Sequence, residues 1–282
     1  MKTGLALEGG AMRGLFTCGV LDVFMEHGIR FDAAAGISAG AVFGCNFKSG
    51  QIGRAVRYNK KYCRDRRYCS LWSLITTGDL YGVDFCYREL PDVLDPFDRA
   101  AFKNDPLEFY IGATDILTGK IVYHLCSDGG ERDMMWMRAS ASMPLCSRPV
   151  QIDGYTLLDG GIVEAVPYPP LERAGCGRIV TILTQPLGYV KEKSGAVPWA
   201  KALLRKYPQV AAAMAVRHDR YNLQMAEIAQ REAAGDMLVI RPPEPLGVRR
   251  TENDPNELER VYRIGRAEGE KRLGEVEAFI GP

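Results

Sequence analysis

The chain has 282 residues, of which 46% are hydrophobic and 25% are charged, and its formal net charge is +1. This composition is typical of a globular protein, and the small net charge argues against a dedicated nucleic-acid-binding protein. The eight cysteines include no C-x-x-C pair and no zinc-type spacing, as expected in a reducing compartment. A strand is expected from residue 3 and no apolar run approaches about 18 residues, so we expect neither a signal peptide nor a membrane span and predict a cytoplasmic protein.

Strands and helices alternate at the start of the chain. Residues 3–8 and 31–35 look like buried strands, and residues 15–27 and 38–48 have helical apolar spacing. This order predicts an α/β fold, in which a parallel sheet is covered on both faces. Further strands are expected at 108–114, 120–125, 178–184 and 237–240, with a hairpin over 149–158 that turns at Asp153-Gly154. Further helices are expected at 131–140, at 199–234 with a break near Tyr207-Pro208, and at 256–279.

We expect one domain over residues 1–282, because no repeat or low-complexity linker divides the chain. Residues 50–90 form a helical excursion that could act as a cap. The region from about residue 195 is expected to be helical as well.

Residues 36–40 have the pattern G-x-S-x-G. The pattern consists of Gly36, Ile37, Ser38, Ala39 and Gly40. It falls where a short apolar strand meets a helix, which is where a serine nucleophile projects from a sharp turn. Flanking glycines leave room for that turn and for a substrate. On this pattern alone, an ordinary glycine-rich loop between strand and helix is an equal alternative.

A serine hydroxyl needs a general base to act as a nucleophile at neutral pH. The chain has three histidines, His27, His124 and His218. They lie near a helix end, within a strand-like run and in an arginine-rich helix, and none follows a strand in a glycine-flanked loop. We therefore expect them to be surface residues or satisfied core residues.

A carboxylate could serve as the base instead. Asp159 ends an apolar strand and is followed by Gly160 and Gly161, whereas Asp128 lies in a second D-G-G sequence. Either aspartate could be part of an ordinary turn. The apolar approach to Asp159 would raise its pKa and its basicity, which favours it modestly, but the local patterns leave the choice open.

A glycine-rich loop follows the first strand. It consists of Gly9, Gly10, Ala11, Met12, Arg13 and Gly14. Because the loop opens a helix, its backbone N–H groups can converge on an anion. It lacks the Lys-Ser/Thr pair of a P-loop, and Ala11 breaks the G-x-G-x-x-G pattern. Beside a serine elbow, an oxyanion hole is the better interpretation, and a nucleotide-binding domain is a weak alternative.

Taken together, three blocks strongly resemble the patatin-like phospholipase family, and the opening resembles its bacterial branch: G-G-A-M-R-G at 9–14, G-I-S-A-G at 36–40 and D-G-G at 159–161. Two further stretches, 139–145 and 163–167, resemble other family segments. The resemblance spans at least residues 3–167. It implies a three-layer α/β/α sandwich around a mainly parallel sheet.

The resemblance also implies roles for individual residues. The family works with a Ser-Asp dyad, which accounts for the missing histidine and favours Asp159 over Asp128. Ser38 would be the nucleophile and Asp159 the base. The scheme requires no metal and no cofactor.

In the family, backbone N–H groups of the first loop hold the oxyanion, which here implies those around Gly10, Ala11 and Met12. Arg13 would brace the loop or meet a substrate phosphate. One departure is Ala11, because the family loop usually has glycine there. If the position requires a positive φ, alanine would cost roughly 1 kcal/mol.

We therefore expect a serine acyl-ester hydrolase that releases fatty acid from phospholipids or lysophospholipids. One alternative is an esterase, thioesterase, peptidase or acyltransferase that uses the same dyad on another acyl substrate. A second alternative is a lipid-binding protein of the same fold without turnover.

An enzyme acting on lipids must reach them, and two basic segments could contact anionic headgroups at the membrane periphery. Residues 51–69 combine arginines and lysines with three tyrosines, and residues 191–205 place Trp199 and two leucines beside basic side chains. The alternative for both is a solvated helix face whose aromatic side chains face the core.

Overall fold

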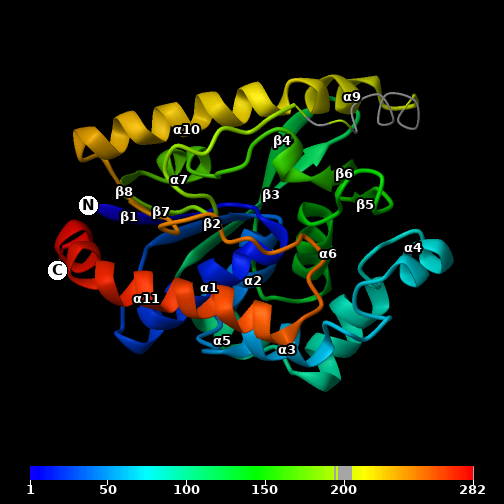
Figure 1. The fold of residues 1–282 in the computed structure, drawn as a ribbon, viewed down its shortest axis with the longest axis horizontal. Coiled ribbons are helices and arrows are strands. Elements are labelled where there is room, and N and C mark those ends of the chain that lie inside the picture. The colour runs from blue at the N-terminus through cyan, green and yellow to red at the C-terminus, as the bar shows by residue number, and fades with distance from the viewer. Residues whose placement is uncertain (194, 196–204, 282) are drawn as a thin grey trace.

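A mixed sheet of eight strands forms the centre of the computed structural model, which describes residues 1–193, 195 and 205–281 (Figure 1). The strands are β1 (Lys2–Leu7), β2 (Ala33–Ile37), β3 (Glu108–Asp115), β4 (Lys120–Leu125), β5 (Val150–Ile152), β6 (Tyr155–Asp159), β7 (Cys176–Ile182) and β8 (Met237–Ile240). Their order is β5-β6-β3-β2-β1-β7-β8, and β4 also pairs with β3. The strands β3, β2, β1, β7 and β8 run parallel, whereas β4, β5 and β6 form antiparallel pairs.

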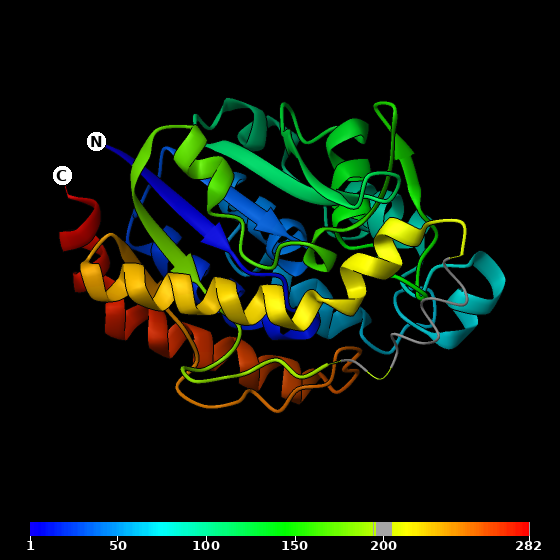
Figure 2. The same cartoon turned by 90° about the horizontal axis from the view of Figure 1, so that it is seen from above.

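Helices lie on both sides of this sheet, with α1, α2 and α11 on one side and α7 and α10 on the other (Figures 1 and 2). Their bounds are η1 (Ala11–Arg13), α1 (Gly14–Glu26), α2 (Ala39–Lys48), α3 (Arg54–Tyr62), α4 (Leu71–Thr77), η2 (Phe85–Leu94), α5 (Arg99–Asn104), α6 (Glu131–Ser140), η3 (Gly160–Ile162), α7 (Pro169–Arg173), α9 (Pro208–Ala215), α10 (Arg217–Ala234) and α11 (Pro255–Ile280).

The side chains of β1 show why both faces need a helical layer. Leu5 and Leu7 belong to the core cluster that includes α1, α2 and α11, whereas Ala6 belongs to the cluster that includes α7 and α10. Successive side chains of a strand point to opposite faces, so a strand that is apolar throughout must be covered twice. The predicted three-layer α/β/α arrangement is confirmed.

The C-terminal helix α11 packs directly on α1. Gly19 of α1 and Gly265 of α11 lie where the two helices meet, and a Cβ atom at either position would overlap the main chain of the other helix. The close approach allows Tyr262 to donate a buried hydrogen bond of 2.7 Å to Asp22. Residues from both ends of the chain therefore share one core cluster.

The register of β3 brings the ends of two strands together. Ile37, the last residue of β2, pairs with Gly112, and Asp159, the last residue of β6, pairs with Ala113. Because β4 pairs along the other edge of β3, β2 and β6 share one edge and run toward each other. The residue after β2 therefore meets the last residue of β6 beside two consecutive residues of β3.

Most predicted elements match the observed ones to within about two residues at each end. The strand predicted at 31–35 begins and ends two residues later, as β2 (Ala33–Ile37). The shift arises because Phe31 packs against Phe24 and Phe47 before the chain enters the sheet. The hairpin at Asp153-Gly154 is confirmed by the pairing of β5 with β6.

The predicted helical region 199–234 differs in one respect. Pro208 begins α9, which agrees with the expected break, but a second break at Val216 separates α9 from α10. Residues 199–204 of that prediction lie outside the described residues. Within the described part of the chain, no helix is both long enough and apolar enough to cross a bilayer.

Candidate active site

Ser38 occupies a strained turn between β2 and α2. Its φ and ψ are 55° and −120°, a conformation that residues other than glycine rarely adopt. The turn packs its backbone tightly, since a Cβ atom at Gly36 would overlap the carbonyl group of Gly40, and one at Gly40 would overlap the carbonyl group of Leu7. Both glycines of the G-x-S-x-G pattern are therefore required by close packing, and Ala39 begins α2.

The Ser38 hydroxyl donates a hydrogen bond of 2.7 Å to Oδ2 of Asp159. The other carboxylate oxygen accepts the N–H of Gly161 at 2.7 Å, in the short helix η3 that begins with Gly160. Burial raises the pKa of the Asp159 carboxyl, while the bond from Ser38 and the nearby guanidinium of Arg217 lower it. A carboxylate with a raised pKa is a stronger base for the serine proton.

Ser140, which no motif singled out, holds the main chain of this turn. Its fully buried Oγ accepts the N–H of Ser38 at 2.8 Å and donates to the carbonyl oxygen of Gly112 at 2.6 Å. The hydroxyl therefore bridges the elbow and β3. The available signal was the resemblance of residues 139–145 to a family segment.

The loop after β1 borders the same pocket as Ser38. Ala11 has a φ of 49°, so the position does require the conformation in which alanine is strained. Among the described residues, the N–H groups of Gly10, Ala11 and Met12 have no hydrogen-bond partner. Ala11 and Met12 line the pocket together with Ser38. Unoccupied amides at this place suit a developing oxyanion.

The other residues of the loop hold it in position. The N–H of Gly9 donates to the carbonyl oxygen of Ala165 at 3.2 Å, and Gly14 begins α1. The guanidinium of Arg13 contacts the hydroxyl of Thr184 at 3.4 Å. Arg13 thus braces the loop against the chain that follows β7.

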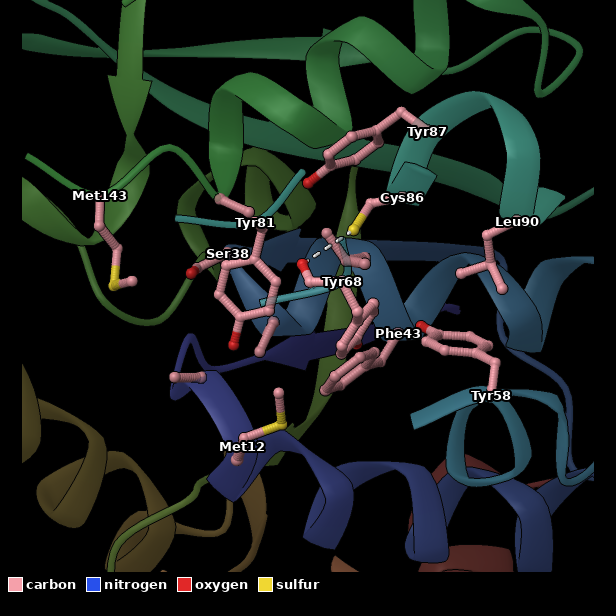
Figure 3. Close-up of a pocket in the computed structure, with 14 residues that line it drawn as sticks. Met12, Ser38, Phe43, Tyr58, Tyr68, Tyr81, Cys86, Tyr87, Leu90 and Met143 are labelled. Atoms are coloured by element: carbon pink, nitrogen blue, oxygen red, sulfur yellow. Dashed lines mark hydrogen bonds between the residues drawn. The ribbon is translucent and has the colours of Figure 1, made fainter. Parts of the chain in front are cut away.

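An apolar pocket opens at Ser38 (Figure 3). About 640 Å³ of space that protein atoms do not fill lies between its walls, and this figure includes space that is open to solvent. The rings of Tyr58, Tyr68 and Tyr81 line it together with Leu90, and none of its lining residues is an acid or a base such as lysine or arginine. The helical excursion predicted at residues 50–90 therefore supplies one wall of the pocket.

Within the described residues, none of the three histidines forms a hydrogen bond with the Ser38–Asp159 pair. His27 and His218 lie beside surface carboxylates, and His124 pairs with Asp133. The alternative aspartate, Asp128, accepts the N–H of Gly130 at 2.8 Å and so belongs to a local turn.

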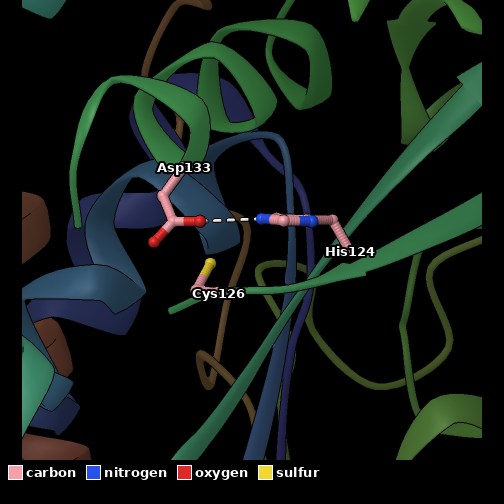
Figure 4. Close-up of side chains that lie close together, drawn as sticks. All are labelled: His124, Cys126 and Asp133. Carbon is pink, nitrogen blue, oxygen red and sulfur yellow. Dashed lines mark hydrogen bonds and ion pairs between the residues drawn. The ribbon is translucent and has the colours of Figure 1, made fainter. Parts of the chain in front are cut away.

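A second cluster, His124, Cys126 and Asp133, has its potential metal ligands within 4.8 Å of one another (Figure 4). Asp133 Oδ1 lies 2.7 Å from His124 Nε2, and Oδ2 accepts the N–H groups of residues 127–129 at 2.8–3.0 Å. The carboxylate is therefore occupied in closing the turn before α6. The His124 ring also stacks on Trp136 with its centroid 4.9 Å away. These contacts account for the cluster as a structural feature.

A family model described as patatin-like phospholipase matches residues 5–171. This match covers more than half of the chain and includes the first loop, the elbow and Asp159. The chain belongs to the patatin-like phospholipase family. A second family model, a domain of unknown function (DUF6363), matches residues 207–281 of this patatin-like protein.

Similar proteins include the uncharacterized protein YjjU of Escherichia coli, 31% identical over 191 residues that cover 66% of this chain and 52% of that protein. An uncharacterized NTE family protein of Mycobacterium tuberculosis is 29% identical over 181 residues, 64% of this chain and 48% of its own length. The chain thus spans about half the length of these relatives. Lysophospholipase nte1 of Aspergillus terreus is 26% identical over 96% of this chain but only 18% of that protein.

Among solved structures, VipD from Legionella pneumophila aligns with a TM-score of 0.47 at 11% identity, covering 99% of this chain and 70% of that one.

Proposed function

We propose that this protein is a serine acyl-ester hydrolase in which Ser38 is the nucleophile and Asp159 the general base. The observation that carries the proposal is the 2.7 Å hydrogen bond between these side chains at an apolar pocket. Membership of the patatin-like phospholipase family supports a hydrolase that acts on ester bonds.

In the first half of the reaction, Ser38 Oγ attacks the acyl carbonyl carbon while Asp159 Oδ2 takes the hydroxyl proton. The N–H groups of Gly10, Ala11 and Met12 stabilise the tetrahedral oxyanion, and each such donor is worth on the order of 3 kcal/mol. The intermediate collapses when the ester bond breaks. The departing alcohol takes the proton from Asp159, and the acyl group stays on Ser38.

In the second half, water attacks the acyl-serine carbonyl while Asp159 removes a proton from the water. The same N–H groups hold the second oxyanion. Collapse releases the fatty acid, and the proton returns from Asp159 to Ser38. The bond from the Gly161 N–H keeps the carboxylate oriented through both halves.

We propose phospholipids or lysophospholipids as the substrate class. The uncharged pocket suits a fatty acyl chain, whose burial is favourable in proportion to its apolar area. The relative named lysophospholipase in Aspergillus terreus supports the same class. A panel of esters and thioesters with one common acyl chain would separate phospholipid hydrolysis from the thioesterase alternative.

The dyad is tested by Ser38→Ala and Asp159→Asn. Each should lower hydrolysis of a short acyl ester by about 10⁴-fold, with cooperative thermal unfolding retained. Ser127→Ala, which removes an exposed serine hydroxyl elsewhere on the chain, is the matched control. Wild-type rates in either dyad variant would refute the assignment.

A fluorophosphonate probe separates the hydrolase from a lipid-binding protein without turnover. If the protein is a serine hydrolase, the probe should label it covalently at Ser38. A folded protein that binds lipid vesicles but is not labelled would favour the binding protein.

In the basic segment 51–69, Tyr58, Tyr62 and Tyr68 are all buried, which agrees with the alternative of core-facing aromatic side chains. Contact with anionic headgroups would therefore rest on the exposed basic side chains of the segment, which do not include the buried Arg54. Of the second segment, 191–205, Trp199 lies outside the described residues.

We infer that helix α4 contacts the lipid surface. Leu71, Trp72 and Ile75 are 71%, 46% and 83% exposed, and α4 lies at the periphery in both views (Figures 1 and 2). The guanidinium of Arg66 lies 4.7 Å from the Trp72 ring, so a cation accompanies the apolar side chains, as in interfacial helices.

This contact is tested by co-sedimentation with anionic vesicles. Ile75→Glu should weaken binding, whereas Leu117→Glu, at an exposed leucine in the turn after β3, should not. Binding should also fall as salt rises. Equal binding to neutral and anionic vesicles would contradict the electrostatic part.

A further inference from the structure

Helix α10 carries three polar side chains that reach the loops of the active site. They are Arg217, Tyr221 and Gln224, and positions that are four and three residues apart lie on one face of a helix. The helix lies on the side of the sheet that also carries α7 (Figure 2). It belongs to the second matched region, 207–281, beyond the patatin-like phospholipase match at 5–171. The motifs that locate the dyad therefore do not account for these side chains.

Gln224 holds the backbone on which the oxyanion loop begins. Its Oε1 accepts the N–H groups of Ala165 at 3.2 Å and Val166 at 3.1 Å, and its Nε2 donates to the carbonyl oxygen of Val166 at 2.8 Å. The carbonyl oxygen of Ala165 in turn accepts the N–H of Gly9, the first residue of the loop, at 3.2 Å. One side chain of α10 thus fixes the backbone acceptor of the loop.

Tyr221 holds the same loop through a buried carboxylate. Its hydroxyl donates to Glu8 at 2.9 Å, and the other oxygen of Glu8 accepts the N–H and the hydroxyl of Thr184. Thr184 packs against the loop, since a Cβ atom at Gly10 would lie 2.7 Å from its hydroxyl oxygen. Because a buried carboxylate is costly without hydrogen bonds, these donors determine where Glu8 lies. Glu8 directly precedes the loop, which is therefore held from two directions.

Arg217 extends these contacts to the loop of the proposed base. Its Nε donates to the carbonyl oxygen of Gly161, and the N–H of Gly161 binds Asp159 at 2.7 Å. Farther along the same face of α10, Ile228 is buried in the core cluster that includes Ala6 of β1. The helix is thus anchored on the sheet while its first turns contact both active-site loops.

We propose that α10 positions the active site, with Tyr221 and Gln224 as positioning residues for the N–H groups of Gly10, Ala11 and Met12. The proposal rests on the proposed hydrolase function and gives the second matched region a part in that reaction. Donors to an oxyanion are effective when they are fixed in place before the charge develops. Through Glu8 and Ala165, α10 supplies that fixation from outside the region that contains the dyad.

The first test is kinetic and uses a short, soluble acyl ester. Tyr221→Phe and Gln224→Met remove the hydrogen bonds and keep most of the bulk. Each should lower kcat about tenfold with KM unchanged, because the oxyanion contacts are made in the transition state and not with the bound ester.

The matched controls are Tyr155→Phe, which removes the hydroxyl of an exposed tyrosine, and Gln230→Met, at an exposed position of α10 itself. Both should keep the wild-type kcat. If Tyr221→Phe and Gln224→Met lowered Tm but kept the wild-type kcat well below Tm, the contacts of α10 would stabilise the fold only, and the proposal would be overturned.

Hydrogen exchange tests the position of the loop without substrate. The Gly9 N–H, which is bonded to Ala165, should exchange about tenfold faster in Tyr221→Phe and Gln224→Met than in the wild type and the two controls. Faster exchange in a wild-type background that hydrolyses no ester would sink the hydrolase and keep the positioning role of α10. Unchanged exchange, or an equal increase in the controls, would overturn the positioning role whatever the activity.

Discussion

The Ser38–Asp159 pair borders two unlike regions of the molecule. The pocket region, formed largely by α2, α3 and η2 with residues between them, has no charged lining side chain. The cationic region, formed by Arg13, Lys191 and Arg217, has no carboxylate ion-pair partner among the described residues. The dyad therefore lies between an uncharged and a positively charged part of the molecule.

The two regions also differ in where they come from along the chain. The pocket and Arg13 lie within residues matched by the patatin-like phospholipase model, whereas Lys191 lies after that match and Arg217 lies in the second matched region, 207–281. Under the proposed function, residues 5–171 supply the dyad and the acyl pocket. Lys191 and Arg217 would add positive charge from outside that range.

Outside the dyad itself, the largest effect is expected from Ser140→Ala, which changes a residue that supports the dyad and belongs to neither region. Removal of this hydroxyl takes away the acceptor of the Ser38 N–H and one donor to the Gly112 carbonyl oxygen, at a cost of about 1–3 kcal/mol in unfolding free energy. Because the elbow is displaced, kcat/KM should fall about ten- to a hundredfold for every ester. Loss for long-chain esters alone would show that Ser140 serves the pocket region only.

The next effect isolates the pocket region. Leu90 lines the pocket at the end away from Ser38 (Figure 3), so Leu90→Phe should shorten the space for the acyl chain. We expect about a tenfold loss of kcat/KM for the longest chains of an ester series, with short chains spared. Val93→Phe places the same aromatic ring on the exposed side of η2 and is the matched control. A uniform loss across chain lengths would place the acyl chain elsewhere.

A smaller effect links the cationic region to the dyad through pH. Asp159 must be ionised to act as a base, so kcat/KM should fall as pH drops through its pKa, which burial raises above the ordinary value of 3.8. Arg217 lowers this pKa. Arg217→Gln should therefore move the acidic limb of the profile to higher pH, while Arg217→Lys should largely preserve it. If the acidic limb of the pH profile stayed in place in Arg217→Gln, Arg217 would not influence the pKa of Asp159.

The sequence was informative where the chemistry constrains residues that are close together along the chain. The elbow requires glycines on both sides of Ser38, because Gly36 and Gly40 pack against backbone carbonyl groups. The strand ends that carry Ser38 and Asp159 were also recognisable. Their meeting was not, because it follows from consecutive partners on β3, Gly112 and Ala113, and a register between distant strands has no local signature.

The parts that the sequence did not reveal depend on tertiary contacts alone. No local pattern distinguishes Ser140 from the other serines of the chain. Its role follows from the position of its hydroxyl between the turn at Ser38 and β3. Lys191 and Arg217 are separated by 26 positions. From the sequence, Lys191 was only the start of a basic segment that could contact anionic headgroups, and Arg217 was one arginine of an arginine-rich helix. Conversely, the tyrosines of 51–69 suggested a lipid surface but belong to the core, because helical spacing does not tell which face is buried.

The smallest effect concerns Ala11, the residue that both lines the pocket and belongs to the oxyanion loop. Its φ of 49° costs an L-residue about 1–2 kcal/mol. Ala11→Gly would remove that strain but would also give the unfolded chain more freedom, which costs about 0.4–1 kcal/mol. We therefore expect a net gain of about 0.5 kcal/mol, measured as a rise of one or two degrees in Tm. Since glycine donates the same N–H, the selectivity for chain length should stay unchanged. A fall in Tm would mean that the positive φ costs Ala11 less free energy than the unfolded chain gains in conformational freedom from glycine.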